Sequence, residues 1–335
     1  MGLKSVSCGL NGFGRFGLHF LSNYIQLRDT LGFSLTYIND EKLSIFDAVK
    51  ILNNDKYVQL FKDFKIYVDG EYLVISNMDY ECKIRYTNSD PRKLSWLGKP
   101  DIFLECSGRY TDATLARMFK TNNTRVVLIS ATSLNADQTL VYGYNHHQFD
   151  PNSDVISYGS CTVNAFSALT NFLADTFVFE SVDVNVIHNL PEHMLTIENR
   201  DTLVRKKCTL SKVAPIIIDC ITDKNLYINY TLIPYSGVSI MDFKYSFDLS
   251  GSAEDVFSVL ENEVAKGSLK GLYGIQEFDN GPQEHQNTRC SAVIIKESSK
   301  VIGNHLYLHT YFDNENSANR YIDLTNYIAE EITLG

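Results

Sequence analysis

The sequence contains no apolar run close to the roughly 20 residues that a membrane-spanning helix needs. Its first residues also lack the apolar core of a cleavable secretory signal. The seven cysteines are an odd number and form no Cys-x-x-Cys pair, which argues against a disulfide framework and a zinc ribbon. The histidines have no other ligand types at metal-binding spacing. These absences predict a cytoplasmic protein without a metal site.

The sequence also lacks an excess of basic residues. Its net charge is −10, which argues against a nucleic acid or an anionic membrane as partner, because no basic surplus is present to neutralise phosphates. This is a global balance, so a local basic pocket stays compatible with it. With 335 residues, 44% hydrophobic and 21% charged, the chain is long enough for two domains with a sizeable core.

The first half alternates short apolar runs with helical patterns, which is typical of βαβ units and a parallel sheet. A helix is expected over residues 16–27. The expected strands cover residues 5–10, 33–39, 101–107, 125–130 and 154–159. We therefore predict an N-terminal Rossmann domain of the α/β class, with a doubly wound parallel sheet, over residues 1–159.

The second half is rich in strands once a helix over residues 162–177 has ended. The expected elements here are strands over 181–188, 227–234, 238–249, 291–297 and 306–312, with a helix over 253–267. They predict a C-terminal α+β domain over residues 160–318 with a mostly antiparallel sheet. The final helix, within 319–335, is expected to pack back on the first domain.

The stretch NGFGRFG contains a Gly-x-Gly-x-x-Gly pattern between an expected strand and an expected helix. Gly12 permits the tight turn, Gly14 lets a pyrophosphate approach the backbone, and Gly17 allows close packing of helix on strand. The helix N-terminus then faces the anion. This order of features predicts a dinucleotide site in the first domain, and a plain βαβ turn is the alternative.

An acidic residue closes the second expected strand. Asp40 lies 40 − 12 = 28 residues after Gly12, slightly beyond the usual spacing. A carboxylate there would accept hydrogen bonds from the adenosine ribose and would repel the extra phosphate of NADP. Glu41 adds to that repulsion, so the pattern favours NAD as the cofactor.

A cysteine and a histidine stand at the junctions of expected elements in the second half. Cys161 begins a helix, where the dipole and the free N–H groups are expected to lower the pKa of the thiol. His188 ends a strand 188 − 161 = 27 residues later, and a histidine within reach of the thiol would move its proton. The alternative is a buried thiol and an unrelated histidine.

These segments together resemble the glyceraldehyde-3-phosphate dehydrogenase family. The matching stretches, in the order of the family, are NGFGRFGL, ND, ECSGRYT, ISATS, VYGYNHHQFD, SCTVNA, His188 and FDNE. They run over essentially the whole chain. The resemblance implies NAD-dependent oxidation of an aldehyde, by default glyceraldehyde 3-phosphate, through a Cys161 thioester with acyl transfer to inorganic phosphate.

The resemblance also assigns roles to residues of both domains. Cys161 would be the nucleophile, His188 the base, and Asn314 would hold the nicotinamide carboxamide. The cofactor-binding positions that it implies are Gly12, Phe13, Gly14, Arg15, Phe16, Asp40, Ser107, Gly108, Ser130 and Asn314. The positions that match the site of inorganic phosphate are Ser160, Thr162 and Thr209.

Two positions depart from the family where the substrate phosphate would bind. Pro191 stands in place of a threonine, and Leu232 in place of an arginine. A leucine cannot replace a charge-assisted hydrogen bond, which contributes about 1.5–3 kcal/mol. The basic residues of the stretch NRDTLVRKK are either a replacement anion site or a solvated charge run: Arg200, Arg205, Lys206 and Lys207.

These departures keep several hypotheses open. The default is oxidation of glyceraldehyde 3-phosphate, and the first alternative is a different aldehyde, with water as the acyl acceptor. The second alternative is a catalytically weak relative that serves as a binding or scaffold protein. The resemblance implies a homo-oligomer, and the segment between His188 and Thr209 is shorter than in the family, which leaves tetramer and dimer open.

Overall fold

The computed structural model describes residues 6–55, 58–190, 194–248, 254–313 and 317–334. The chain divides into two compact units, and each is described by itself. Unit 1 comprises Met1–Tyr142, His146–Gly159 and Ala318–Gly335. Unit 2 comprises Gly143–Asn145 and Ser160–Ser317.

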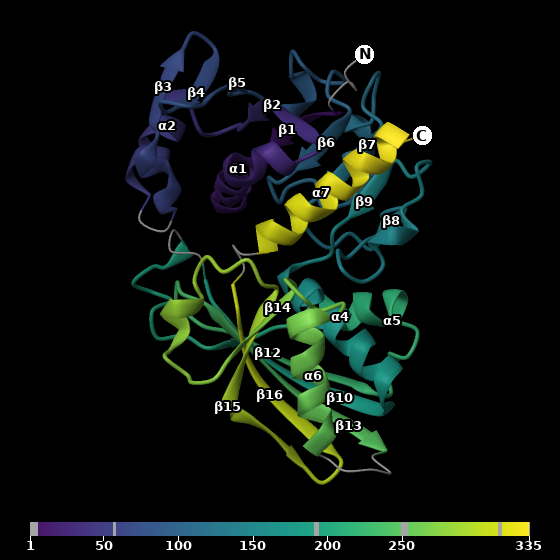
Figure 1. Cartoon of the computed structure of the whole chain (residues 1–335). Coiled ribbons are helices and arrows are strands. Elements are labelled where there is room, and N and C mark those ends of the chain that lie inside the picture. The colour runs from purple at the N-terminus through teal and green to yellow at the C-terminus, as the bar shows by residue number, and fades with distance from the viewer. Residues whose placement is uncertain (1–5, 56–57, 191–193, 249–253, 314–316, 335) are drawn as a thin grey trace. The chain divides into compact units, whose positions relative to one another are not determined.

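Unit 1 is built on a sheet with the strand order β3-β4-β5-β2-β1-β6-β7-β9-β8 (Figure 1). The strands are β1 (Val6–Asn11), β2 (Phe33–Asn39), β3 (Lys65–Asp69), β4 (Tyr72–Ser76), β5 (Glu81–Thr87), β6 (Ile102–Glu105), β7 (Val126–Ile129), β8 (Gln138–Thr139) and β9 (Val155–Ser157). Following this order across the sheet, every neighbouring pair from β5 to the edge strand β8 is parallel. Only the pairs β3–β4 and β4–β5 are antiparallel. The predicted fold class is confirmed for this unit, and the antiparallel extension at one edge was not visible in the sequence.

Four α-helices accompany this sheet in the described residues. They are α1 (Arg15–Leu27), α2 (Ile45–Asn54), α3 (Ala113–Ala116) and α7 (Ser317–Leu334). The short 3-10 helices are η1 (Arg28–Thr30), η2 (Gln59–Asp63), η3 (Pro91–Lys93), η4 (Arg117–Phe119) and η5 (His146–Gln148). The sheet order places β2 and β6 on opposite sides of β1, so the chain reverses direction across the sheet at β1. Ligands of doubly wound folds bind outside the carboxyl ends of strands at such a switch point.

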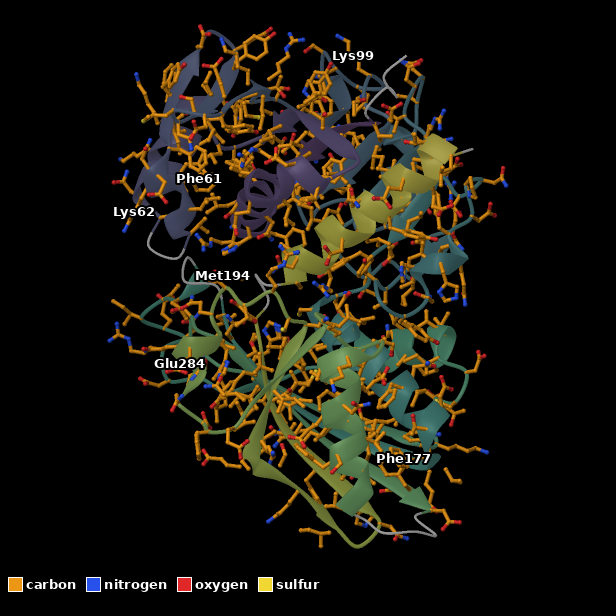
Figure 2. All side chains as sticks on the ribbon, in the orientation of Figure 1. Phe61, Lys62, Lys99, Phe177, Met194 and Glu284 are labelled. Atoms are coloured by element: carbon orange, nitrogen blue, oxygen red, sulfur yellow. The ribbon has the colours of Figure 1, made fainter. Side chains whose placement is uncertain are left out.

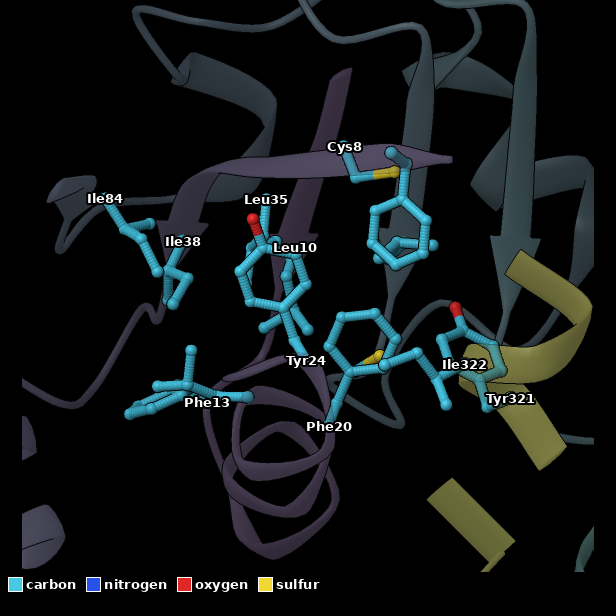
Figure 3. Packing of buried hydrophobic residues seen from close by; sticks show 14 of the residues in the cluster. Cys8, Leu10, Phe13, Phe20, Tyr24, Leu35, Ile38, Ile84, Tyr321 and Ile322 are labelled. Atoms are coloured by element: carbon cyan, nitrogen blue, oxygen red, sulfur yellow. The ribbon is translucent and has the colours of Figure 1, made fainter. Parts of the chain in front are cut away.

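The core of unit 1 is rich in aromatic residues and includes residues from both ends of the chain. Phe20, from α1, and Tyr321, from α7, pack with their ring centroids 5.8 Å apart (Figure 3). Tyr158 also meets the Tyr321 ring, at 5.3 Å. The Tyr321 hydroxyl donates a hydrogen bond of 2.6 Å to the carbonyl of Leu128 on β7. The C-terminal helix is thereby part of the core of unit 1.

Unit 2 is built on a second sheet, with the strand order β11-β12-β10-β13-β16-β15-β14. The strands are β10 (Val178–His188), β11 (Val204–Arg205), β12 (Leu226–Leu232), β13 (Ser239–Asp248), β14 (Tyr273–Gln276), β15 (Ala292–Ile302) and β16 (His305–Phe312). The helices are α4 (Cys161–Thr176), α5 (Leu210–Ile217), α6 (Glu254–Lys266) and the 3-10 helix η7 (Pro282–His285). Only β10–β12 and β14–β15 pair parallel, so the predicted mostly antiparallel sheet is confirmed.

The two faces of the unit 2 sheet differ sharply along β10. Val182, Val184 and Val186 are buried, whereas Asp183 between them is exposed. This alternation follows from the two-residue period of a strand. The helix α4 packs against β10, and Phe177, where α4 ends, lies 5.4 Å from the Phe247 ring of β13 (Figure 2).

Two classes of feature are absent from the residues that the structure describes. No helix there is long and apolar enough to cross a membrane. Within the same residues, no three or more His, Cys, Asp or Glu side chains are grouped so that they could hold a metal ion.

The Tyr321 hydrogen bond gives a test of how α7 is held. Replacing Tyr321 with Phe keeps the ring contacts and removes the donor from the Leu128 carbonyl, at an expected cost of about 1–3 kcal/mol. We expect the free energy of unfolding in urea to fall by that amount. Tyr72→Phe on β4, where the side chain is 39% exposed, is the control. Equal stability of the two variants would contradict the role given to this bond.

Candidate active site

The turn that follows β1 needs glycine at its first position. Gly12 has a φ of +98°, in the region that side chains disfavour. A Cβ on Gly12 would overlap the backbone of Ser107, which follows β6. The absence of a side chain therefore lets the ends of β1 and β6 come together at the switch point of the sheet.

The next two glycines of the pattern meet different surroundings. A Cβ on Gly17 would overlap the Gly12 carbonyl, so this glycine allows α1 to pack tightly on the turn. A Cβ on Gly14 would have no atom within 4 Å, and Gly14 is exposed at the N-cap of α1. The first turn of α1 contains no acidic residue. The helix N-terminus is therefore open and has no carboxylate of its own, which suits a phosphate group.

Asp40 fixes the loop that follows β2. Its Oδ2 accepts a hydrogen bond of 2.8 Å from the Phe13 backbone N–H. Its Oδ1 accepts bonds of 2.9 Å from the N–H groups of Lys42 and Leu43. Because a carboxylate has about four acceptor sites, these three bonds leave it capacity for a ribose hydroxyl. Beside it, Glu41 forms an ion pair with Arg109.

A buried carboxyl group organises the end of β6. Glu105 is 1% exposed and accepts a hydrogen bond of 2.6 Å from Asn11 Nδ2. It also accepts bonds from the backbone N–H and the hydroxyl of Ser107. Burial raises the pKa of Glu105, while these donors oppose that rise. Asn39 donates to Asn11 Oδ1 at 2.9 Å, so one polar network connects the ends of β1, β2 and β6.

The other residues of the predicted cofactor set contribute in different ways. The Phe13 ring is buried, 6.2 Å from the Tyr86 ring, and the Phe16 ring packs against Tyr158 and Tyr321. Arg15 is paired with Asp55. The phenylalanines thus belong to the core, and only their backbones are left for contact with a ligand. Gly12, Gly14, Asp40, Ser107, Gly108 and Ser130 all lie in unit 1, whereas Asn314 lies outside the described residues.

Cys161 is the first residue of α4, and the residue before it caps the helix. Ser160 has extended backbone angles, φ −150° and ψ 174°, and its hydroxyl accepts the N–H of Val163 at 3.3 Å. A serine N-cap of this kind sets where a helix begins. Cys161 is half-buried, and its thiol is therefore held at a helix N-terminus.

His188 ends β10 and lies next to this thiol. Cys161 Sγ and His188 Nε2 are 3.5 Å apart. His188 Nδ1 is 2.8 Å from the carbonyl oxygen of Asn189, which requires Nδ1 to carry the proton. Nε2 is then the acceptor that faces the thiol. The structure thus brings together the two residues that the sequence predicts as a catalytic pair.

Asn189 holds this arrangement in place, and no sequence motif pointed to it. Its Nδ2 donates to the Gly237 carbonyl at 2.6 Å, and its Oδ1 accepts from the Ser239 hydroxyl at 3.0 Å. The Ser239 oxygen in turn accepts the Asn189 backbone N–H at 3.0 Å. Both residues are buried. The backbone carbonyl that orients His188 is therefore fixed by the neighbouring strand β13.

The protonation of the pair differs from the sequence-based expectation. Burial raises the pKa of the Cys161 thiol to about 12, and the nearby Cys208 and Asp313 add to the rise. The backbone N–H groups of Thr162 and Cys161 at the helix start oppose it without overcoming it. Burial also lowers the pKa of His188. The expectation of a lowered thiol pKa was wrong, because desolvation outweighs the helix N-terminus, and both pKa shifts favour an uncharged pair.

The predicted phosphate-binding residues lie around the start of α4, on two segments. The Thr162 hydroxyl is 3.1 Å from the Ser160 hydroxyl and 3.6 Å from Cys208 Sγ. Thr162 is buried, whereas Thr209 is exposed at the N-cap of α5. Cys208 is thus a second thiol beside the site, and it was not among the predicted site residues.

Leu232 lies directly beside His188. The two residues are register partners on the parallel strands β10 and β12. Arg205 is bonded to Asn229, and the side chains of Arg200, Lys206 and Lys207 are exposed. Pro191, the other position that departs from the family, lies outside the described residues.

Comparisons with known proteins find similarity over nearly the whole chain. The chain is 28% identical to a glyceraldehyde-3-phosphate dehydrogenase of Priestia megaterium over 343 residues, covering 97% of this chain and 98% of the relative. It is 27% identical to glyceraldehyde-3-phosphate dehydrogenase 1 of Bacillus subtilis, covering 98% and 99%. It is 26% identical to the Geobacillus stearothermophilus enzyme of that name, with the same coverage. No family model matches the chain.

The class is thus a two-unit α/β protein with a Rossmann-like sheet and a Cys–His pair. Within that class, the chain is similar to glyceraldehyde-3-phosphate dehydrogenases, at 25–28% identity over nearly its full length. The substrate is a separate question.

The pKa directions predict how Cys161 reacts with pH. Because its pKa is raised to about 12, the thiolate fraction should rise about tenfold per pH unit from pH 7 to 9. We expect the rate of alkylation by iodoacetamide, followed on the Cys161 peptide by mass spectrometry, to rise likewise. A rate that is already constant from pH 6 upward would show a thiolate–imidazolium pair and overturn this assignment.

The crowding at Gly12 predicts a selective loss of cofactor affinity. Gly12→Ala forces the β1 and β6 turns apart, and overpacking of this kind costs about 1–3 kcal/mol. We expect the affinity for NAD, measured by calorimetry, to fall by about tenfold or more. Gly70→Ala is the matched control, because Gly70 also has a positive φ, of 62°, but has open space at its Cβ. Equal affinities of the two variants would refute the prediction.

Proposed function

We propose that this protein is an NAD-dependent aldehyde dehydrogenase that forms a thioester at Cys161 and transfers the acyl group to inorganic phosphate. The observation that carries the proposal is the contact of 3.5 Å between Cys161 Sγ and His188 Nε2, with Nδ1 held as a donor to Asn189. A nucleophile, a base and a group that orients the base form the minimal arrangement for nucleophilic catalysis.

The first step follows from the uncharged state of the pair. Cys161 Sγ attacks the aldehyde carbon as its proton passes to His188 Nε2, and His188 then gives that proton to the carbonyl oxygen, which becomes the hydroxyl of a thiohemiacetal. The backbone N–H of Cys161 at the start of α4 and the imidazolium stabilise the developing oxyanion. A buried imidazole with a lowered pKa accepts the proton only when attack occurs, so the thiol is protected between turnovers.

The second step oxidises the thiohemiacetal to a thioester. NAD, when bound, supplies the acceptor for the hydride that leaves the carbon. His188 takes the hydroxyl proton as the C=O bond forms. An oxygen of inorganic phosphate then attacks the thioester, the C–S bond breaks, and Cys161 regains its proton. Ser160, Thr162 and Thr209 are the residues we assign to the phosphate.

Several features of unit 1 support NAD as the cofactor. The open N-terminus of α1 at Gly14 suits the pyrophosphate, and the spare acceptor capacity of Asp40 suits the adenosine ribose. The turn at Ser107 and Gly108, held by Glu105, borders the same edge of the sheet. We also assign Arg15, the backbones of Phe13 and Phe16, Ser130 and Asn314 to this cofactor.

The proposal extends to the state of the protein in the cell. The seven cysteines are an odd number and form no Cys-x-x-Cys pair, which fits a reducing cytoplasmic compartment. Relatives of the same family lead us to propose a homo-oligomer, to be measured by analytical ultracentrifugation.

A specific observation favours a second candidate substrate. Leu232, rather than a cation, is the register partner of His188. The default substrate is glyceraldehyde 3-phosphate, and the second candidate is an aldehyde without that phosphate.

The deciding experiment measures NADH formation with glyceraldehyde 3-phosphate and a panel of unphosphorylated aldehydes, with and without inorganic phosphate. Cys161→Ser should abolish turnover, and His188→Asn should lower kcat by about 10²–10⁴-fold. Cys220→Ser, which changes a half-buried thiol elsewhere in unit 2, should leave the rate unchanged. Turnover that needs no phosphate would assign the acyl transfer to water. Turnover that survives in Cys161→Ser would refute the thioester.

A further inference from the structure

One row of three side chains runs from the edge strand β11 over β12 to His188 on β10. Val204 on β11 pairs with Leu232 on β12, and Leu232 pairs with His188 on β10. Side chains of directly paired residues stand on the same face of a sheet. Leu232 and Val204 therefore stand on the face that carries His188 and Cys161. These two residues are called the apolar strip below.

The other face carries the polar groups of the same strands. Arg205, the neighbour of Val204, is bonded to Asn229, and Asn229 Nδ2 donates to Asn185 Oδ1 at 2.7 Å. Asn229 and Asn185 are register partners. They stand on the face opposite to the apolar strip, because they lie three residues before Leu232 and His188. The nearest cation along β11 is therefore turned away from the catalytic pair and is already bonded there.

Two aromatic rings lie beside the His188 imidazole. The Tyr230 ring centroid is 5.5 Å from that of His188, and Tyr230 shares the face of Leu232 because it lies two residues before it. The Phe312 ring approaches from β16 at 5.7 Å. The imidazole thus stands among Tyr230, Phe312 and Leu232, none of which carries a charge.

The apolar strip is reachable from solvent. β11 is the outermost strand of the sheet, and Val204 is 40% exposed there, while Leu232 is half-buried. An acyl chain attached to Cys161 and directed toward this edge would lie over both side chains. Each CH₂ group buried in this way contributes about 0.8 kcal/mol.

A buried carboxyl group near the thiol also disfavours the binding of a negatively charged substrate group there. The carboxyl of Asp313 is buried and contributes to the raised pKa of Cys161. Lys206, the next residue on the face of Val204, has its N–H bonded to the Tyr230 carbonyl. By strand spacing, its Cα stands about 12 Å from that of His188. Its exposed ammonium would be screened by solvent and would hold an anion only weakly.

We propose that the apolar strip selects unphosphorylated aliphatic aldehydes, whose carbon chain lies over Leu232 and Val204 while the carbonyl is held at Cys161 and His188. This inference rests on the proposed function, because it needs Cys161 as the nucleophile. It identifies Leu232 as the residue that determines specificity.

The test compares kcat/KM for hexanal and for glyceraldehyde 3-phosphate in the full-length protein, followed as NADH formation at saturating NAD. The wild type should favour hexanal by at least tenfold. Leu232→Arg and Val204→Arg should each lower kcat/KM for hexanal about tenfold and raise it for glyceraldehyde 3-phosphate. Val204→Arg changes an exposed edge position, so it keeps the test valid if Leu232→Arg does not fold.

Tyr227→Arg is the matched control, because Tyr227 lies on β12, is 64% exposed and pairs with Asp183 on the opposite face. It should leave the ratio of the two kcat/KM values unchanged. A wild type that favours glyceraldehyde 3-phosphate, or arginine variants with an unchanged ratio, would overturn the apolar strip and leave the proposed function standing. Absence of NADH with every aldehyde, despite bound NAD, would refute the proposed function itself and this inference with it.

Discussion

The hydrogen bond between His188 Nδ1 and the Asn189 carbonyl is the interaction on which the proposed chemistry of this protein depends. It fixes the tautomer, so that Nε2 faces Cys161 as an acceptor. Its geometry is set by Ser239 on β13 and by the carbonyl of Gly237, which precedes that strand, because both hold the Asn189 side chain. The sheet of unit 2 thus fixes the position of one proton acceptor, His188 Nε2. The N-cap at Ser160 fixes the position of the thiol.

In unit 1, a buried carboxyl group holds the ends of three strands together. Three strand ends must meet at the switch point of the sheet without leaving polar groups unpaired, and Glu105, Asn11 and Asn39 satisfy one another there. A network of this kind is costly if any member is lost, because the others remain buried without partners. In unit 1 these side chains belong to the recognised motifs, whereas in unit 2 Asn189 and Ser239 lie outside them.

Much of this architecture was readable from particular residues. The glycine pattern and the strands around it predicted β1, α1 and β2 within a residue or two, because apolar periodicity and turn glycines act locally. Cys161 and His188 were predicted through the family resemblance. The strands β3 and β4 were not, since they are short antiparallel strands at an edge. Asn189, Ser239 and Cys208 were also missed, because their contacts join segments far apart in the chain.

The sequence by itself therefore determined the class of fold, the family resemblance and the candidate catalytic pair, all of which follow from local patterns or from ordered motifs. The tertiary structure decided the rest. It reversed the expected pKa of Cys161, because desolvation depends on every neighbour that excludes water from the thiol. It also decided what stands beside His188, because strand register, which no local pattern specifies, aligns Val204, Leu232 and His188 in one row.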